Sequence, residues 1–420
     1  MEHDLSSQSA PTLSEVLRTR SVVLYLFVSF SISAGTYMQA AALGKQVYDI
    51  TGREMDIGWV GLLEFAPAAL LVLAAGYAAD RFNRRAVVSI AMALEVLCAG
   101  ALFLYARHDQ TSVGPIFLIA FGFGIARAFM APAMRAIPPL LAPVNGLPRV
   151  VALNSAMWQF ALIFGPALSG IFYAIDAQWP YFVSMLIMAI GLVMLLFLRF
   201  TRVQDQSVAR ERASFSTALE GLRFIRRTPV LFAAISLDLF AVLFGGAVAL
   251  LPVIAEERLG VGDVAYGWLR ASAGIGALAM GLLLVVLPIK RNIGRTLFMV
   301  VALFGVATIV LGVTHSYTVA FIAMIVLSAA DMVSVFIRAS LVPLVTPDEA
   351  RGRVNAVENV FIGASNELGA FESGAVSQMA GVPFAVVGGG LATIAVVAVF
   401  WFAFPVLRNI NRFEDVETEV

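Results

Sequence analysis

The stretch Gly76-Tyr77-Ala78-Ala79-Asp80-Arg81-Phe82-Asn83-Arg84-Arg85 separates two long apolar runs. Four of its last six residues are charged, whereas only 13% of the whole chain is charged. Arginines in a solvated turn would explain part of this cluster. They would not explain Asp80, nor the glycine four residues earlier on the same helical face. The segment is therefore a candidate for a specific role.

The composition indicates the class of protein. The chain has 420 residues, of which 60% are hydrophobic, and its 28 acidic residues balance 28 basic ones. Apolar segments of roughly 20 residues recur along the sequence, and each is long enough to cross a bilayer as a helix. Continuous apolar runs indicate helices, because the strands of a membrane barrel alternate apolar and polar residues. The sequence predicts an all-α polytopic membrane protein.

Residues that bind metals or form disulfides are scarce. Cys98 is the only cysteine, which excludes an internal disulfide and a cysteine-based metal cluster. His3, His108 and His315 fall near the start of the chain or in predicted loops, so we expect no metal site and no cofactor. No zinc-protease motif or nucleotide-binding loop is present. We therefore expect a protein that is not an enzyme and that binds no nucleic acid.

We predict twelve transmembrane helices in two groups of six. The polar stretch 201–228 is the longest interval without an apolar run and separates the two halves. The predicted spans are 22–48, 55–79, 86–106, 113–138, 151–175, 179–199, 229–255, 264–287, 295–314, 317–345, 353–378 and 383–406. The predicted parts are an N-terminal tail (1–21), a first bundle (22–200), a linker (201–228), a second bundle (229–407) and an acidic tail (408–420). We expect the acidic tail to be disordered. The N-terminal tail is polar and lacks the form of a cleaved signal peptide, so the first helix is expected to stay in the protein.

The basic residues predict the orientation in the membrane. Most of the 28 lysines and arginines fall in the tails, the linker and the loops on their side of the membrane. Only Lys45, Arg53, Arg107 and Arg258 fall in the opposite loops, and three arginines lie within spans. Because positive charge is retained on the cytoplasmic side, both ends of the chain are predicted to be cytoplasmic.

The two halves also repeat each other in sequence. A shift of 204 residues pairs Pro139 with Pro343, Arg149 with Arg353, Gly165 with Gly369, Ser169 with Ser373, and Gly170 with Gly374. This shift overlays the fourth and fifth spans on the tenth and eleventh, as two parallel six-helix repeats require. Such a chain is expected to bind a substrate near the membrane midplane, between two halves that rock.

The spacing Gly-x-x-x-Asp-Arg-x-x-Arg-Arg resembles the signature between helices 2 and 3 of the major facilitator superfamily. The resemblance implies two pseudo-symmetric six-helix bundles and a gating motif formed by Gly76, Asp80, Arg81, Arg84 and Arg85. In that family the aspartate pairs with a motif arginine and with the N-terminus of helix 11, where the helix dipole favours a carboxylate. This pairing latches the halves together on the cytoplasmic side.

Two departures from that signature matter. Asn83 stands where the family has glycine, and because asparagine tolerates positive φ we expect the turn to be kept. The corresponding stretch of the second half, from Gly281 to Arg295, contains no aspartate. The latch is therefore expected to be asymmetric.

A second motif, Gly165-Pro166-Ala167-Leu168-Ser169-Gly170, lies in the fifth span. Small residues at this spacing allow close helix contact, and Pro166 bends the helix. Tight packing explains Gly170 better than contact with a substrate. The motif nevertheless resembles the antiporter motif of drug exporters in the superfamily. Together with the segments 40–49, 152–155 and 347–356, it is similar to the branch that contains the enterobactin exporter and macrolide efflux pumps.

Charged residues within spans are costly and mark candidate functional sites. We assign to proton coupling or substrate binding the residues Glu64, Arg127, Asp238, Asp331, Arg338, Glu358, Glu367 and Glu372. Glu95 and Arg270 also fall in spans and can instead lie near the interface. Seven carboxylates against three arginines leave four without a basic partner. Such carboxylates favour the protonated form in a dry interior and can carry a proton.

Three of these residues have a structural alternative. The resemblance implies that Arg127 takes part in proton transfer, and Asp331 is its counterpart at the 204-residue shift. Arg338 lies seven residues after Asp331, two turns along the same helical face. Ion pairs between helices would explain all three residues without transport chemistry.

The sequence predicts the function only by class. Tyr37, Asn154, Trp158 and Gln159 are candidates to line a cavity, by their depth alone. Our leading hypothesis is an alternating-access transporter of the inner (cytoplasmic) membrane that works as a monomer. It would expel an amphipathic small molecule, a siderophore or a drug, against the entry of protons. A symporter or uniporter for a nutrient or metal ion is the transport alternative, and a receptor or scaffold is the alternative of a different class.

Overall fold

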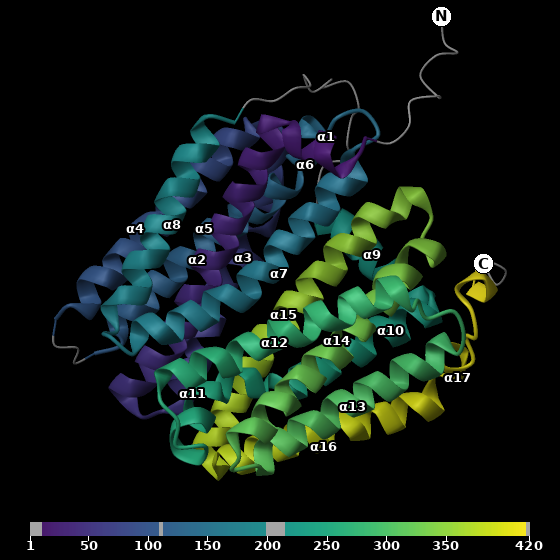
Figure 1. Ribbon diagram of the computed structural model, residues 1–420. Helices are drawn as coiled ribbons and strands as arrows, with labels where there is room; N and C mark the ends of the chain where they lie inside the picture. Colours follow the sequence, from purple (N-terminus) through teal and green to yellow (C-terminus); the bar gives the residue numbers. More distant parts are fainter. Residues whose placement is uncertain (1–10, 109–111, 199–214, 417–420) are drawn as a thin grey trace, which may run out of the picture.

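A computed structural model describes residues 11–108, 112–198 and 215–416. Within these ranges it leaves undescribed the side chains of Val72, Leu73, Ala79, Asp80, Asp348 and residues 215–218. The regular elements of the described part are all helices (Figure 1). Those of the first half are α1 (Leu13–Arg18), α2 (Arg20–Thr51), α3 (Glu54–Arg81), α4 (Arg84–Ala106), α5 (Gly114–Arg135), α6 (Pro138–Leu141), α7 (Leu147–Tyr173) and α8 (Gln178–Leu196).

Helix α9 (Phe215–Arg227) lies in the stretch predicted as a linker, and the second bundle follows it. The elements of that bundle are α10 (Pro229–Phe244), η1 (Gly246–Leu250), α11 (Leu251–Val253), η2 (Ile254–Arg258), α12 (Asp263–Val286), α13 (Ile293–Val313), α14 (Tyr317–Val345), α15 (Asp348–Ala380), α16 (Val382–Ala403), α17 (Pro405–Arg408) and η3 (Phe413–Val416). Ten segments of the described part are long and apolar enough to cross a membrane. The remaining long helices, α3 and α15, carry several charges each, and together the set is consistent with twelve spans.

The predicted span 229–255 is present as the segment Pro229–Arg258, but it is not one continuous α-helix. Helix α10 ends at Phe244, and the chain continues through a 3-10 turn and a π-helical turn. The tandem glycines Gly245 and Gly246 weaken the helix at this point. They also allow close packing, because a Cβ on Gly245 would meet the ring of Phe304 and one on Gly246 would meet the backbone of Gly369.

The turn that contains Asn83 is built differently from our expectation. Asn83 has φ −59°, so the predicted positive φ is wrong. Its side chain instead accepts a hydrogen bond from the backbone N–H of Arg85 at 3.0 Å and caps the N-terminus of α4. In the second half, the residue before α13 is Asn292, and it does adopt the left-handed conformation, with φ 56°.

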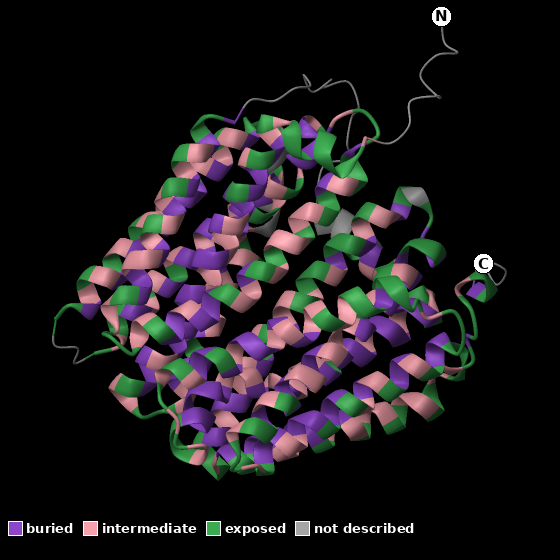
Figure 2. Cartoon of the chain, in the orientation of Figure 1, coloured by how far each residue is buried: buried purple, intermediate pink, exposed green. Residues whose placement is uncertain are grey.

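The helices form two bundles that meet at one end and diverge toward the other (Figure 1). At the first end, one apolar core contains residues of both halves, including Leu43 and Val47 of α2 with Leu251 and Tyr266. At the other end, near α1, α6, α9 and α17, each bundle has a separate core. We call these the closed end and the open end. Buried and exposed stripes alternate around the long helices (Figure 2).

The tail beyond Arg408 is ordered as far as Val416, so the prediction of disorder is wrong for that part. The backbone N–H of Gly294 donates to the carbonyl of Ile410 at 3.0 Å. Phe413 packs edge-on against Phe336 with 6.4 Å between ring centroids, and Val416 is buried. These contacts fasten the tail to the start of α13 and to α14. Residues 417–420 lie outside the described range.

Candidate functional site

The first half contains a buried cluster of charges on three helices. Arg127 of α5 forms an ion pair with Glu64 of α3, and its Nε lies 3.4 Å from Oε1 of Glu95 on α4. Glu95 is fully buried. Glu95 Oε2 and Arg127 Nη2 are both buried without a hydrogen-bond partner. One guanidinium therefore serves two carboxylates and leaves one oxygen of Glu95 without a partner.

A carboxylate of the second half reaches this cluster. Glu367 of α15 lies against Gly61 of α3, where its Oε2 occupies the space that a Cβ on Gly61 would take. It is close enough to Glu64, Arg127 and Arg270 to interact with their charges. Glu367 thus lies on the contact between α3 and α15, which joins the two halves.

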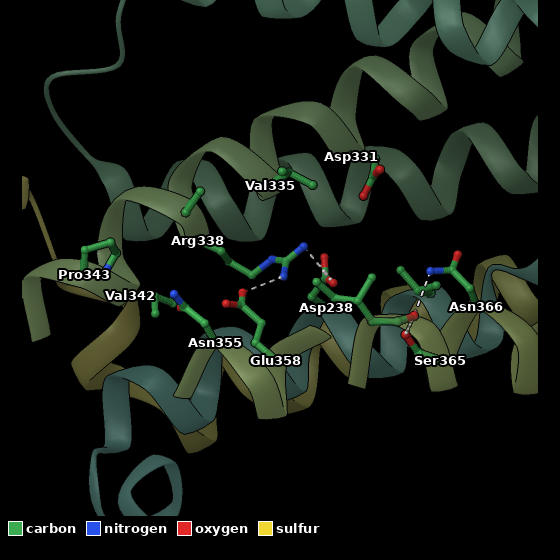
Figure 3. A pocket seen from close by; sticks show the side chains of 13 residues that line it. Asp238, Asp331, Val335, Arg338, Val342, Pro343, Asn355, Glu358, Ser365 and Asn366 are labelled. Atoms are coloured by element: carbon green, nitrogen blue, oxygen red, sulfur yellow. Dashed lines mark hydrogen bonds and ion pairs between the residues drawn. The ribbon is translucent and has the colours of Figure 1, made fainter. Parts of the chain in front are cut away.

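The second half has its own cluster around an arginine. Nη2 of Arg338 on α14 lies 2.9 Å from Oδ2 of Asp238 on α10, and Nη1 lies 3.4 Å from Oε1 of Glu358 on α15 (Figure 3). Ser334 donates a hydrogen bond of 3.1 Å to the other oxygen of Asp238. The side chain of Arg338 is only 4% exposed. As in the first half, one arginine is held between two carboxylates from neighbouring helices.

A cavity of about 400 Å³ adjoins this second cluster. Figure 3 shows Asp331, Asp238, Arg338 and Glu358 arranged around it. Its other lining residues are Val242, Val335, Ala339, Val342, Pro343, Asn355, Ile362, Ser365 and Asn366. Asp331 makes no ion pair or hydrogen bond with any residue that the structure describes. The cavity therefore combines apolar walls with a free carboxylate.

The charged residues predicted within spans do not pair as one arginine with one carboxylate. Arg127 and Arg338 each take two carboxylates, and within the described residues Arg270 has no carboxylate within ion-pair distance. Asp331, Glu367 and Glu372 are left without an arginine partner in the same part of the chain; Glu372 only accepts a hydrogen bond from Ser373, at 3.4 Å. Arg127 and its repeat counterpart Asp331 lie in separate clusters, one in each half.

The glycines of the helix 5 motif and their repeat counterparts occupy equivalent contacts. Gly165 faces Tyr37 of α2, and Gly369 faces the backbone of Val242 and Leu243 in α10, so both contacts lie within a half. Gly170 faces Gly267 of α12, where a Cβ would meet Cα at 2.7 Å. Gly374 faces Glu54 of α3, where a Cβ would meet the carbonyl oxygen at 2.8 Å. The last two contacts join the halves at the closed end. Pro166 lies inside α7, between these glycines.

The comparison with known protein families agrees with this architecture. A family model described as "Major Facilitator Superfamily" matches residues 25–370. The chain belongs to the major facilitator superfamily. Its members are transporters of small molecules in membranes and are not enzymes, so this chain is a multi-pass membrane transporter.

Individual relatives of this superfamily member include drug exporters. Macrolide efflux protein A of Streptococcus pyogenes is 24% identical over 236 residues, which cover 56% of this chain and 58% of that protein. The match thus spans little more than half of that relative's length. Multidrug efflux pump Tap of Mycolicibacterium fortuitum is 26% identical over 414 residues, which cover 93% of this chain and 97% of that protein.

Solved structures confirm the fold. A bacterial homologue of the human lysosomal transporter Spinster, in an inward-facing and unoccupied conformation, superposes with a TM-score of 0.69. Its sequence identity is 14%, and the match covers 93% of this chain and 96% of that one. A POT family transporter in complex with 5-aminolevulinic acid gives a TM-score of 0.72 at 13% identity, with 93% and 97% coverage.

The superfamily signature lies at the open end, in the turn between α3 and α4. Arg84 donates to the carbonyl of Ala136 at 2.9 Å, and Arg85 donates to the carbonyls of Leu196 and Leu198. Arg81 lies over the ring of Tyr77, 5.7 Å from its centroid. The side chain of Asp80 lies outside the described residues, and Gly76 is a half-buried residue of α3. The described arginines thus tie the turn to α8 and to the segment after α5.

The residues chosen as cavity candidates by depth gather on α2 and α7, away from the cavity of Figure 3. Tyr37 and Trp158 are in edge-to-face contact, with 6.0 Å between ring centroids, and Trp158 is 45% exposed. Buried side-chain oxygens of Asn154 and Gln159 have no hydrogen-bond partner. None of the four lines the cavity next to Asp331.

A polar network at the closed end was not predicted. Lys45 of α2 forms ion pairs with Asp49, with Glu256 of η2 at 2.9 Å and with Asp263 of α12 at 3.8 Å. Tyr48 donates a hydrogen bond to Glu257, which also crosses between the halves. The only signal in the sequence was a lysine at the end of an apolar run and an acidic pair at the end of another. This network and the glycine contacts together hold the closed end.

Proposed function

We propose that this transporter exports an amphipathic small molecule in exchange for protons, by alternating access. The observation that carries the proposal is the position of Glu367, at the contact between the halves and beside the Glu64–Arg127 pair. Glu64 and Glu95 form ion pairs with Arg127 there, and Glu367 lies close enough to feel the charges of Glu64 and Arg127. Charges that face each other across a moving contact couple the charge state to the conformation.

The direction of that coupling follows from electrostatics. When Glu64 and Glu367 are both ionised, their repulsion opposes contact between α3 and α15, and a proton on either one removes it. Protonation therefore favours the sealed closed end. If the closed end is periplasmic, as the distribution of basic residues favours, a proton that enters from outside drives the change to the cytoplasm-facing state. Release of that proton and binding of the substrate inside then permit the return.

The proposed location is the inner membrane of a bacterium, with both chain ends in the cytoplasm. The cargo is proposed as a drug-like or siderophore-like molecule because macrolide and multidrug efflux proteins are among the relatives. The cavity beside Asp331 supports a small-molecule cargo, since about 400 Å³ falls within the range of such sites.

Transport in liposomes tests the proposal. Purified full-length protein would be reconstituted, a pH gradient imposed, and uptake of a macrolide and a panel of amphipathic dyes measured together with proton flux. We expect substrate-linked proton flux, and we expect Glu367→Gln to lose proton-driven transport while substrate-exchange without a gradient persists. Asp176→Asn is the matched control, because Asp176 lies in an exposed loop. Absence of linked proton flux across the panel, or full coupling in Glu367→Gln, would refute the proposal.

We also propose that Asp80 serves as the latch of the open end when that end closes. Arg84 and Arg85 in the following turn are held by backbone carbonyls. These hydrogen bonds fix the turn at the end of α3, the helix end that carries Asp80. Asp80→Asn is expected to reduce the transport rate while leaving equilibrium binding of the substrate unchanged. A loss of substrate binding in Asp80→Asn would instead indicate a folding defect, and a transport rate equal to that of the wild type would refute the latch.

A further inference from the structure

The cavity in Figure 3 has an unbalanced charge. Three carboxylates, Asp238, Asp331 and Glu358, face one guanidinium, that of Arg338. Arg338 is the only basic residue of the lining. With all groups ionised the lining therefore carries a formal charge of −2, and its apolar walls weaken the screening of that charge.

The charges also differ in what a ligand can reach. The side chain of Arg338 is 4% exposed, and its charge is already balanced by its ion pairs with Asp238 and Glu358. Asp331 has no partner among the described residues, and Glu358 is 15% exposed. A ligand in this cavity would therefore meet an excess of carboxylates, with Asp331 as the one that has no ion-pair partner among the described residues.

A neutral side chain of the lining also offers an acceptor. Asn366 donates its amide N–H to the carbonyl of Ile362 at 2.8 Å, which leaves the side-chain oxygen as an acceptor. Exposed apolar side chains stand nearby, because Val335 and Ile362 are each 39% exposed. The site thus offers acceptors for N–H groups and apolar surface for a hydrocarbon body.

We infer that this cavity binds the cationic group of an amphipathic substrate, with Asp331 as its counter-ion. The inference rests on the proposed export function and narrows it, since it selects cationic amphiphiles and rejects anionic ones such as acidic chelators. A cation at Asp331 would give the unpartnered carboxylate a charge partner and would bring the lining closer to neutrality. An anion would instead meet the excess negative charge.

Two hydrophobic ions of nearly the same size and opposite charge test the inference. Binding of tetraphenylphosphonium and tetraphenylborate to the purified full-length protein in a neutral detergent would be measured at equilibrium, with no pH gradient. We expect the cation to bind and the anion to bind at least about tenfold more weakly, a difference of about 1.4 kcal/mol. Asp331→Asn should weaken binding of the cation by a similar factor.

The variant is well suited to this test. Asp331→Asn removes no ion pair or hydrogen bond between described residues, and a thermal melt would verify that the fold is kept. Asp176→Asn, in an exposed loop, makes the same chemical change far from the cavity and should bind the cation like the wild type.

The outcomes separate this inference from the proposed function. Equal or tighter binding of the anion, no binding of the cation, or cation binding that Asp331→Asn leaves unchanged would overturn the inference. Any of these results is compatible with proton-linked export of a neutral or anionic cargo. Conversely, Asp331-dependent cation binding without substrate-linked proton flux in liposomes would refute proton-coupled export while the cation site stands.

Discussion

The contact between Gly170 and Gly267 should control which end of the transporter is open. A Cβ on Gly170 would lie 2.4 Å from the carbonyl oxygen of Asp263 and 2.7 Å from Cα of Gly267, across the contact between α7 and α12. Ordinary contact begins near 3.4 Å, so Gly170→Ala requires a separation of 3.4 − 2.4 = 1.0 Å. Both neighbours are backbone atoms, and no side chain can rotate away to provide this space.

The expected magnitude follows from overpacking. Inserting a methyl group into a tight contact costs about 1–3 kcal/mol. Because this cost applies only while the closed end is sealed, it shifts the equilibrium toward the state in which that end is open. A bias of 1–3 kcal/mol corresponds to a population change of roughly 5- to 150-fold.

Distances between spin labels at the open end would measure the shift. Val144 and Leu344 are exposed, lie one in each half, and could be replaced by cysteine in a Cys98→Ser background. Gly170→Ala should move the distance distribution toward shorter values, and Gly267→Ala should do the same. Gly388→Ala is the matched control, because a Cβ there meets nothing within 4 Å. An unchanged distance distribution in both Gly170→Ala and Gly267→Ala would refute the reasoning.

Three further predictions concern the ion pairs and a buried hydrogen bond. Lys45→Met removes the pairs with Glu256 and Asp263 and should shift the same label distances in the same direction as Gly170→Ala. The bias on the conformational equilibrium should be only about 0.2–1 kcal/mol, because Glu256 is 54% exposed. A larger shift than that of Gly170→Ala would contradict this ranking. Arg338→Met leaves the buried Asp238 and the half-buried Glu358 without their cation and should cost about 3–5 kcal/mol of stability, seen as a lower Tm. Adding Asp238→Asn should recover part of that loss, and an unchanged Tm in the single variant would show that the pair is not needed. Tyr181→Phe removes the 2.6 Å hydrogen bond to Gln46 and should lower stability by about 0.5–1.5 kcal/mol without changing transport; a loss of transport at unchanged Tm would argue against a purely structural role.

The sequence was most informative where one physical requirement dominates. Apolar runs longer than the bilayer is thick identify most of the long helices, because a membrane leaves a buried backbone little alternative. The sequence repeat also predicted which residues occupy equivalent places in the two halves. Gly170 and Gly374, paired by the 204-residue shift, both make backbone contacts between the halves. Fold class and family membership were therefore accessible without coordinates.

The partners of the charged residues were not accessible in the same way. Sequence gives the depth of Arg127 in its helix but not the direction in which the side chain points, so its shared contact with Glu64 and Glu95 could not be derived. The break after Phe244 was hidden because Gly245 and Gly246 sit in a run that remains apolar. The turn at Asn83 was misread because asparagine can either adopt positive φ or cap a helix, and only the geometry distinguishes these uses.

The paired glycine contacts at the closed end determine how sharply the molecule switches. At Gly170 and Gly374 the seal is backbone against backbone, at two places related by the internal repeat. Long side chains can stretch and re-form contacts gradually, whereas backbone atoms in contact lose their attraction within a fraction of an ångström. Because both places stand on rigid helices of the same two bundles, neither can separate far while the other stays closed. Opening of this end is therefore an all-or-none event, and a half-open pore that would leak protons is disfavoured by the architecture itself.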